Sequence, residues 1–86
     1  MKETRPFSGW TVDDIVLGIN QELERARAKF PAWSDDLIHN AAIVVEEGGE
    51  LLRAALQCHY EDGALEACDK EAIQTAAMCF RFLMGR

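Results

Sequence analysis

The sequence predicts an all-α protein, a short bundle of three main helices that is completed by oligomerisation. Apolar residues recur at steps of three and four along most of the chain, which is the period of one helix face, and no segment alternates apolar and polar residues as a strand does. Pro31 and Gly63 separate the periodic segments, as residues that end helices should. The 86 residues are 49% hydrophobic, a surplus for so small a core, and a second copy would bury that surplus.

The first helix is predicted from its cap and its stop signal. We treat residues 1–86 as a single domain in which residues 1–10 form an N-terminal arm without periodicity. Thr11 is a favourable N-cap, and two aspartates follow it in the first turn, where the helix dipole favours anions. The apolar period then continues to Phe30, and Pro31 ends the helix.

The second and third helices are predicted to form an antiparallel hairpin. Ser34 is the expected N-cap of the second helix, which runs to about Tyr60, and residues 61–63 (Glu-Asp-Gly) signal a turn. The third helix covers about residues 64–84. From Ala72 onward it is apolar on nearly every side, so we expect a partner subunit to cover it.

Charge and cysteine content exclude several classes of function. A net charge of −6 argues against nucleic acid or an anionic membrane as a partner, because both require a basic surface. No apolar run reaches the ~18 residues of a membrane span, and no secretory signal follows the N-terminus. Cys58, Cys68 and Cys79 are odd in number and form no CxxC pair, so we expect reduced thiols in a cytoplasmic protein, with Cys79 in the core.

An acidic group interrupts the apolar stretch of residues 43–53. Glu46 and Glu50 are four residues apart and Glu47 and Glu50 three, so a helix gathers all three carboxylates near one face. A divalent cation would relieve their repulsion. Two glycines at positions 48 and 49 weaken the helix. Glycine within a helix usually allows another backbone or a ligand to approach closely. The alternative is the ordinary solvated face of an amphipathic helix.

Glu71 supplies a second acidic position on the third helix. It lies on a mostly small and apolar stripe, where an unpaired carboxylate is costly. Counting the helical rise back from the turn puts Glu71 and Gln74 at about the height of Glu50, with Glu47 one turn further out. These oxygens could form a cage for Mg²⁺ or Mn²⁺. The alternative is a core salt bridge of Glu71 with one of two arginines, Arg53 or Arg81.

The two motifs resemble those of a known enzyme family. The run Glu46-Glu47-Gly48-Gly49-Glu50, then twenty residues, then Glu71-Ala72-Ile73-Gln74, resembles the EExxE and ExxD motifs of the MazG-like all-α nucleoside triphosphate pyrophosphohydrolases. The resemblance extends over roughly residues 12–84. It implies a helical bundle completed as a homodimer or homotetramer. It also implies metal-dependent hydrolysis of a nucleoside triphosphate, (d)NTP, between the α- and β-phosphates, which yields the monophosphate and pyrophosphate.

The resemblance also implies residue roles. Glu47, Glu50 and Glu71 would be ligands of Mg²⁺ or Mn²⁺, and Glu46 would be a further ligand or would orient the attacking water, which makes Glu46 and Glu47 the catalytic pair. Gln74 stands where the family motif has aspartate. Its amide oxygen can ligate Mg²⁺ but brings no charge, so metal affinity could fall or the role could shift to Glu46.

Substrate-binding candidates follow from position. Four cations could reach the phosphates: Lys29, Arg53, Lys70 and Arg81. Arg81 is the first choice because it follows Gln74 by seven residues, with a salt bridge as its alternative. Asn40, seven residues before Glu47, faces the same way, and Trp33 could stack on a base or pack under its own loop.

Two other functions are compatible with the same sequence. A helical module of this fold could bind a nucleotide or a protein partner without catalysis, which the uncharged Gln74 would suit. A plain oligomerisation domain with a solvated acidic face would show no metal-dependent change in stability.

Overall fold

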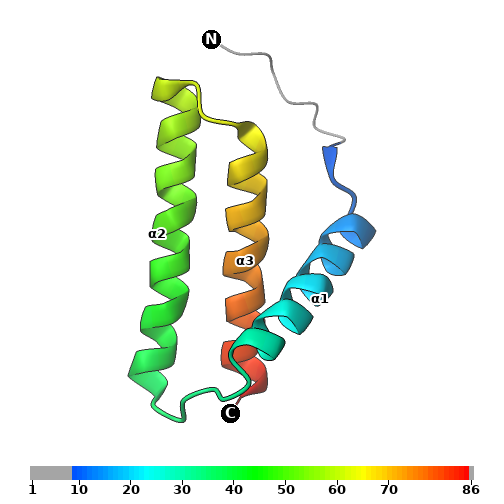
Figure 1. The fold of residues 1–86 in the computed structure, drawn as a ribbon, viewed down its shortest axis with the longest axis vertical. Helices are drawn as coiled ribbons and strands as arrows, with labels where there is room; N and C mark the ends of the chain where they lie inside the picture. Colours follow the sequence, from blue (N-terminus) through cyan, green and yellow to red (C-terminus); the bar gives the residue numbers. More distant parts are fainter. Residues whose placement is uncertain (1–8, 86) are drawn as a thin grey trace.

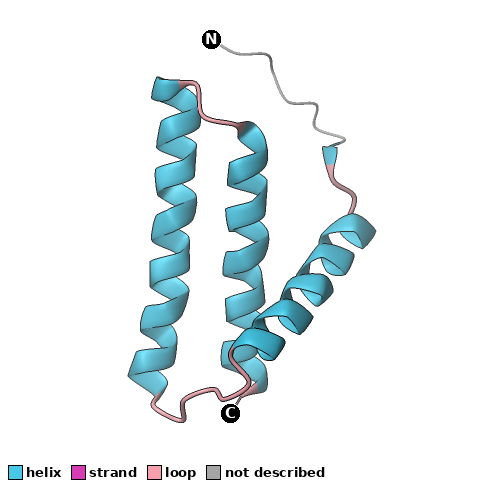
Figure 2. Ribbon diagram, in the orientation of Figure 1, coloured by secondary structure: helices cyan, strands magenta, loops and turns pink. Residues whose placement is uncertain are grey.

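A computed structural model describes residues 9–85 and contains three helices (Figures 1 and 2). They are α1 (Val12–Lys29), α2 (Leu37–Glu61) and α3 (Leu65–Met84), and residues 9–85 include no strand. The all-α prediction with three main helices is therefore confirmed. Most of the predicted N-terminal arm lies outside the described residues.

The predicted start of α1 is also confirmed. The backbone N–H of Asp14 donates to Oγ1 of Thr11 at 3.0 Å, and the N–H of Thr11 donates to Oδ2 of Asp14 at 3.1 Å. This reciprocal capping box satisfies two backbone donors that the first turn would otherwise leave unpaired. Asp13 and Asp14 lie in the first turn, as predicted.

The predicted cap of α2 is wrong by two residues. Asp36, not Ser34, is the N-cap, and its Oδ1 accepts from the backbone N–H groups of Ile38 and His39 at 3.0 and 3.1 Å. The hydroxyl of Ser34 instead accepts from the N–H of Asp36 at 2.9 Å. A carboxylate accepts two bonds at once and is favoured by the helix dipole, so the aspartate caps the helix and the serine holds the turn before it.

A tight connection joins α2 to α3. Asp62 takes the left-handed conformation at φ 58°, and its N–H donates to the carbonyl of Gln57. The N–H of Gly63 donates to that same carbonyl at 2.9 Å, and a Cβ on Gly63 would lie 3.0 Å from the Gln57 carbonyl carbon. The aspartate thus supplies the turn of the backbone, and the glycine allows the chain to pass close to the end of α2.

The core lies where α1 crosses α3 (Figure 1). α2 and α3 lie side by side, whereas α1 is inclined to both and its N-terminal half leans away from them. The buried apolar cluster there is built from residues of α1 and α3: Ile19, Leu23, Ala26, Ala77 and Met78. Ala54 of α2 is buried outside this cluster. None of the described side chains is both large and fully enclosed, which fits the small core expected of this length.

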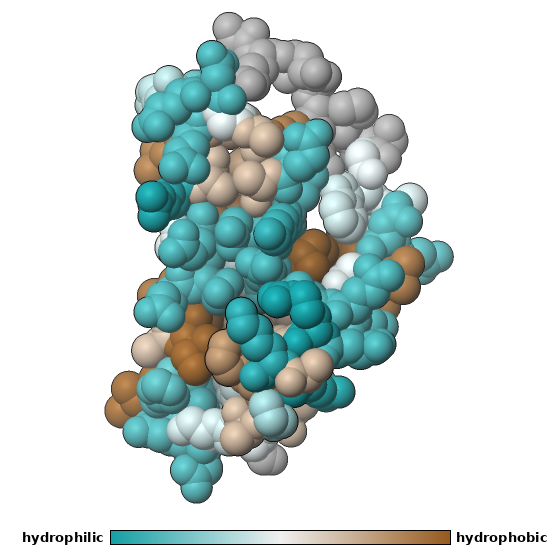
Figure 3. Space-filling view, viewed as in Figure 1, coloured by the Kyte–Doolittle hydropathy of each residue, from teal (hydrophilic) through white to brown (hydrophobic). Residues whose placement is uncertain are grey.

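Large apolar side chains remain on the surface of the single chain. Figure 3 shows several of them exposed among the polar residues of one face. An apolar groove of about 400 Å³ runs between α2 and α3 and is lined by Ala41, Val44, Val45, Cys79, Phe82 and Leu83. Cys79, which we expected in the core, is exposed in this groove, because α1 packs against a different part of α3. None of the described helices is both long and apolar enough to cross a membrane.

The two glycines within α2 have open space beside them. A Cβ at Gly48 or Gly49 would meet no atom of the chain within 4 Å. Close approach of another part of the chain, one of the two reasons we gave for these glycines, is therefore not observed among the described residues.

Replacing Gly49 with alanine is expected to stabilise the isolated chain by about 1 kcal/mol, because alanine costs less conformational entropy in a helix interior. The melting temperature should rise by about 4–8 °C for a domain of this size. Gly85→Ala is the comparison variant and should lower the melting temperature, since its Cβ would lie 2.5 Å from Cδ1 of Trp33. A loss of stability in Gly49→Ala would contradict the prediction and would indicate that a partner molecule fills this space.

Candidate functional site

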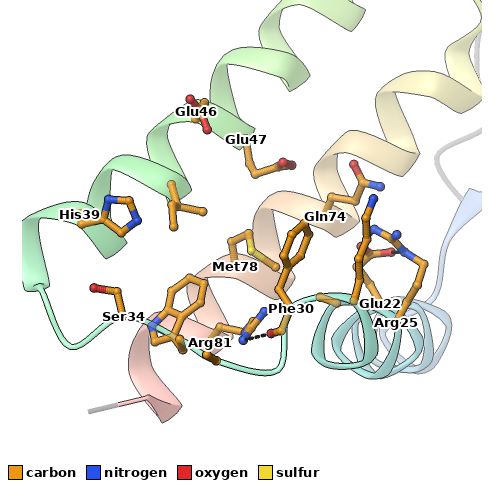
Figure 4. Close-up of a pocket in the computed structure, with 15 residues that line it drawn as sticks. Glu22, Arg25, Phe30, Ser34, His39, Glu46, Glu47, Gln74, Met78 and Arg81 are labelled. Atoms are coloured by element: carbon orange, nitrogen blue, oxygen red, sulfur yellow. Dashed lines mark hydrogen bonds and ion pairs between the residues drawn. The ribbon is translucent and has the colours of Figure 1, made fainter.

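A cavity of about 600 Å³ opens between the three helices (Figure 4). Its size is in the range of small-molecule binding pockets. The lining comes from α1, from the connection that follows it, from α2 and from α3: Glu22, Arg25, Ala26, Lys29, Phe30, Ala32, Trp33, Ser34, His39, Ile43, Glu46, Glu47, Gln74, Met78 and Arg81. Glu46, Glu47, Gln74, Trp33 and Arg81 from the sequence prediction are therefore brought to one cavity.

The cavity has two ends of different chemistry. Figure 4 shows the Glu47 side chain pointing from α2 towards Gln74 of α3, with Glu22 and Arg25 of α1 on the same side. We call this part of the cavity, with Glu46, the acidic end. Ser34 and His39 lie on the opposite side in this view. We call this part of the cavity the aromatic end, because Trp33, which directly precedes Ser34 and stacks on Arg81, lines it. The Phe30 ring lies towards Gln74 in the same view.

Glu47 has an unpaired oxygen at the acidic end. Its Oε2 atom is buried and accepts no hydrogen bond from residues 9–85. Burial raises the pKa of the Glu47 carboxyl most, and the negative charges of Glu71, Glu50, Glu22 and Glu46 raise it further, in that order. Four other glutamates are therefore close enough to act on this carboxylate, which gains from either a proton or a cation.

The predicted metal ligands are not closed around a single point among the described residues. Glu71 and Glu50 act on Glu47 but do not line the cavity, whereas Gln74 does. Within residues 9–85, no three His, Cys, Asp or Glu side chains are placed so that they could hold a metal ion as they stand. Carboxylates repel one another, so without a cation they separate, and rotations about their side-chain torsions would be needed to bring them together.

The donor set nevertheless suits a hard divalent cation. Carboxylate and amide oxygens are the ligands that Mg²⁺ and Mn²⁺ accept, and the unpartnered Oε2 of Glu47 is a buried oxygen that lacks such a partner. The described residues show no ion pair between Glu71 and either Arg53 or Arg81, so the alternative of a core salt bridge is not observed.

Arg81, our first choice for phosphate binding, lies at the aromatic end. It is only 6% exposed, its NH2 group donates to the carbonyl of Phe30 at 2.9 Å, and its guanidinium lies 4.5 Å from the centre of the Trp33 ring. Burial, and then the charge of Arg27, lowers the pKa of Arg81. These contacts fasten the connection between α1 and α2 onto α3.

The remaining predicted residues are dispersed. Asn40 is buried, its Nδ2 donates to the carbonyl of Ser34 at 2.7 Å, and it does not line the cavity. Trp33 is half-buried and lines the cavity as well as packing under its own loop, so both of its expected roles are compatible with its position. Arg53 is exposed away from the cavity, and Lys70 lines a neighbouring hollow of about 350 Å³.

An ion pair on α1, between Glu22 and Arg25, was not predicted from the sequence. Arg25 Nε donates to Oε1 of Glu22 at 3.0 Å, and Arg25 NH2 contacts the other carboxylate oxygen. A signal for Glu22 was present, because it follows buried Ile19 by three residues and precedes buried Ala26 by four, which places it on the core-facing stripe. Its charge made it look like part of the solvated face.

Comparisons of the chain with protein-family models, with curated proteins and with solved structures found no match.

Proposed function

We propose that the protein is a metal-dependent nucleoside triphosphate pyrophosphohydrolase of the MazG-like type, which converts a (d)NTP to the (d)NMP and pyrophosphate. One observation carries this proposal. The buried Oε2 of Glu47 has no partner in the part of the chain that the structure describes. It belongs to a residue that lines a nucleotide-sized cavity and on which the charges of four other glutamates act. An ionised, partly buried carboxylate in such surroundings is costly unless a proton or a cation binds it.

In this proposal α2 and α3 form the antiparallel hairpin that carries the acidic motifs. Glu47, Glu50 and Glu71 would hold Mg²⁺ or Mn²⁺, and Gln74 would contribute its amide oxygen from the cavity wall. When bound, the metal would neutralise phosphate charge and lower the pKa of a coordinated water. Glu46, which is exposed at the cavity and acts electrostatically on Glu47, would orient the attacking water.

The two ends of the cavity fit the two ends of a nucleotide. The ring of Trp33 at the aromatic end suits a base, and His39 on the same side offers a polar edge. The acidic end would take the triphosphate together with its cations. Such a substrate is a free nucleotide in the cytoplasm, and the proposal requires neither nucleic acid nor a membrane.

The same proposal includes a homodimer or homotetramer. It is supported by the apolar groove between α2 and α3 and by large side chains at its rim that are exposed in the single chain, such as Val45 at 73% and Leu83 at 62%. Light scattering on the purified protein should give a mass of at least two chains, and Val45→Asp should lower it. A monomer at tens of micromolar would contradict this part of the proposal.

A pyrophosphate-release screen tests the activity. The purified protein is incubated with canonical and modified nucleoside triphosphates in Mg²⁺ or Mn²⁺, and release of pyrophosphate with formation of the monophosphate is expected for at least one of them. Release of orthophosphate and the diphosphate would indicate a different reaction. No turnover over the whole panel with either metal would overturn the proposal.

A second candidate is a non-catalytic nucleotide-binding module of the same fold. It is favoured by the uncharged Gln74 at the cavity wall and by the absence, within residues 9–85, of acidic side chains already closed around one point. Calorimetry that shows nucleotide binding without hydrolysis would select this candidate.

A further inference from the structure

Glu22 and Arg25 form a two-point ion pair at the edge of the acidic end. The carboxylate faces inward, with the Glu22 side chain 13% exposed, whereas the Arg25 side chain is 56% exposed. Each carboxylate oxygen of Glu22 meets a different nitrogen of Arg25, so the guanidinium is held in one plane. The arginine is therefore presented to the cavity in a fixed orientation.

Most of the donors of Arg25 remain available. A guanidinium has five N–H donors, and Glu22 engages Nε and one of the two terminal nitrogens. The other terminal nitrogen, and one hydrogen of the engaged one, have no partner among the described residues. Arginine donors in this planar arrangement match two oxygens of a phosphate group better than a lysine does.

Arg25 lies at the acidic end of the cavity, where the phosphates would bind. Arg25 lines the cavity together with Glu47 and Gln74 and also lines the neighbouring hollow with Lys70. The hydrogen bond with Glu22, the charge of Glu22 and, less strongly, the charge of Glu47 raise the pKa of Arg25. Arg81 is instead engaged at the aromatic end, and the Lys29 Nζ lies 5.4 Å from the centre of the Phe30 ring.

We infer that Arg25 binds the phosphate chain of the nucleotide and that Glu22 positions it for this contact. The inference rests on the proposed function and names the residue that offsets the repulsion between five glutamates and an anionic substrate. A phosphate chain held at the acidic end by cations on Glu47 would pass within reach of the free edge of Arg25.

The test compares Arg25→Gln with Arg27→Gln. Both variants lose one positive charge from α1, but Arg27 does not line the cavity, and its NH2 contacts Sδ of Met84. For pyrophosphate release, Arg25→Gln should raise KM by about 10- to 100-fold, the usual effect of losing hydrogen bonds from a charged donor. Arg27→Gln should leave KM within about twofold, and melting temperatures verify that both variants fold.

Glu22→Gln tests the positioning role. The amide keeps the shape of the side chain but cannot pair both of its ends with the guanidinium, so KM should rise by a smaller factor while kcat stays close to that of the unmodified protein. Arg25→Lys keeps the positive charge but loses the planar guanidinium with its paired N–H donors. It should therefore bind the substrate more tightly than Arg25→Gln but less tightly than the unmodified protein. A fall in kcat with unchanged KM for Glu22→Gln would contradict a positioning role.

Binding measurements separate this inference from the proposed function. Calorimetry with Mg²⁺ uses α,β-methylene nucleoside triphosphates, inorganic tripolyphosphate and the matching monophosphates as probes. The unmodified protein could bind the triphosphates without hydrolysing any nucleotide, while Arg25→Gln binds the triphosphates more weakly and the monophosphates equally well. In that case the inference on Arg25 stands and the proposed activity is overturned. If hydrolysis occurs and both arginine variants behave alike, the activity stands and the inference is overturned. If no triphosphate binds, both are overturned.

Discussion

Replacing Glu47 with glutamine is expected to reduce pyrophosphate release by at least about 100-fold, because loss of a metal ligand should cost more than the 10- to 100-fold typical of its outer-shell partners. The same change should raise the melting temperature of the metal-free protein. One carboxylate oxygen of Glu47, Oε2, is buried without a partner among the described residues, and the charges of four other glutamates act on the carboxylate. An amide of nearly equal shape removes that repulsion. Activity and stability should therefore change in opposite directions.

The pH dependence of stability gives this prediction a second measurement. The pKa of Glu47 is raised in the folded protein, so between its unfolded and folded pKa values the folded state holds more protons than the unfolded state. Stability therefore falls as pH rises through that window, and the penalty persists above it. The metal-free protein should gain stability on mild acidification from neutral pH. In Glu47→Gln the part of this gain that comes from the Glu47 carboxyl should be absent.

Glu24→Gln is the matched control, because it removes one negative charge from an exposed position on α1. It should change neither activity nor the pH dependence of stability. If Glu47→Gln retained full activity, or destabilised the metal-free protein by more than Glu24→Gln does, the central role of Glu47 would be disproved.

The parts of the fold that depend on local signals could be predicted from the sequence. The Thr11 cap, the three helices and the turn after α2 are each encoded within a few residues. The cap of α2 was misplaced because Ser34 and Asp36 are both favourable caps two residues apart, and only the backbone shows which one reaches the first free N–H groups. The meeting of Glu71 and Glu47 at one site, which we inferred from distances along two helices, stays a prediction, and the charge of Glu71 does raise the pKa of Glu47.

The parts that depend on how α1 crosses the other helices were not predictable. No periodicity fixes that crossing, so the contribution of Glu22 and Arg25 to the cavity was missed. The burial of Arg81 depends on the path of the connection between α1 and α2, whose Phe30 carbonyl and Trp33 ring it contacts. The apolar residues of α3 predicted burial on nearly every side, but among them only Ala77 and Met78 are buried in the single chain, and Cys79 faces an open groove.

Adding Mg²⁺ or Mn²⁺ is expected to raise the melting temperature substantially. A cation that binds only the folded state stabilises by about 2.7 kcal/mol at a hundred times its dissociation constant. For a domain of this size that corresponds to a rise of roughly 10–20 °C. The reason is specific to this site, since each metal–carboxylate contact replaces repulsion that Glu47 experiences from Glu71 and Glu50.

Salt alone would also weaken that repulsion, so the control is NaCl at the same ionic strength. Screening acts on all exposed carboxylates and should give only a small rise, which Glu47→Gln and Glu24→Gln should share. A bound ion instead requires Glu47, so the rise with Mg²⁺ should be lost in Glu47→Gln and retained in Glu24→Gln. Equal rises in MgCl₂ and NaCl would mean that the acidic residues form only a solvated face, and the plain oligomerisation domain would then be the better description of the protein.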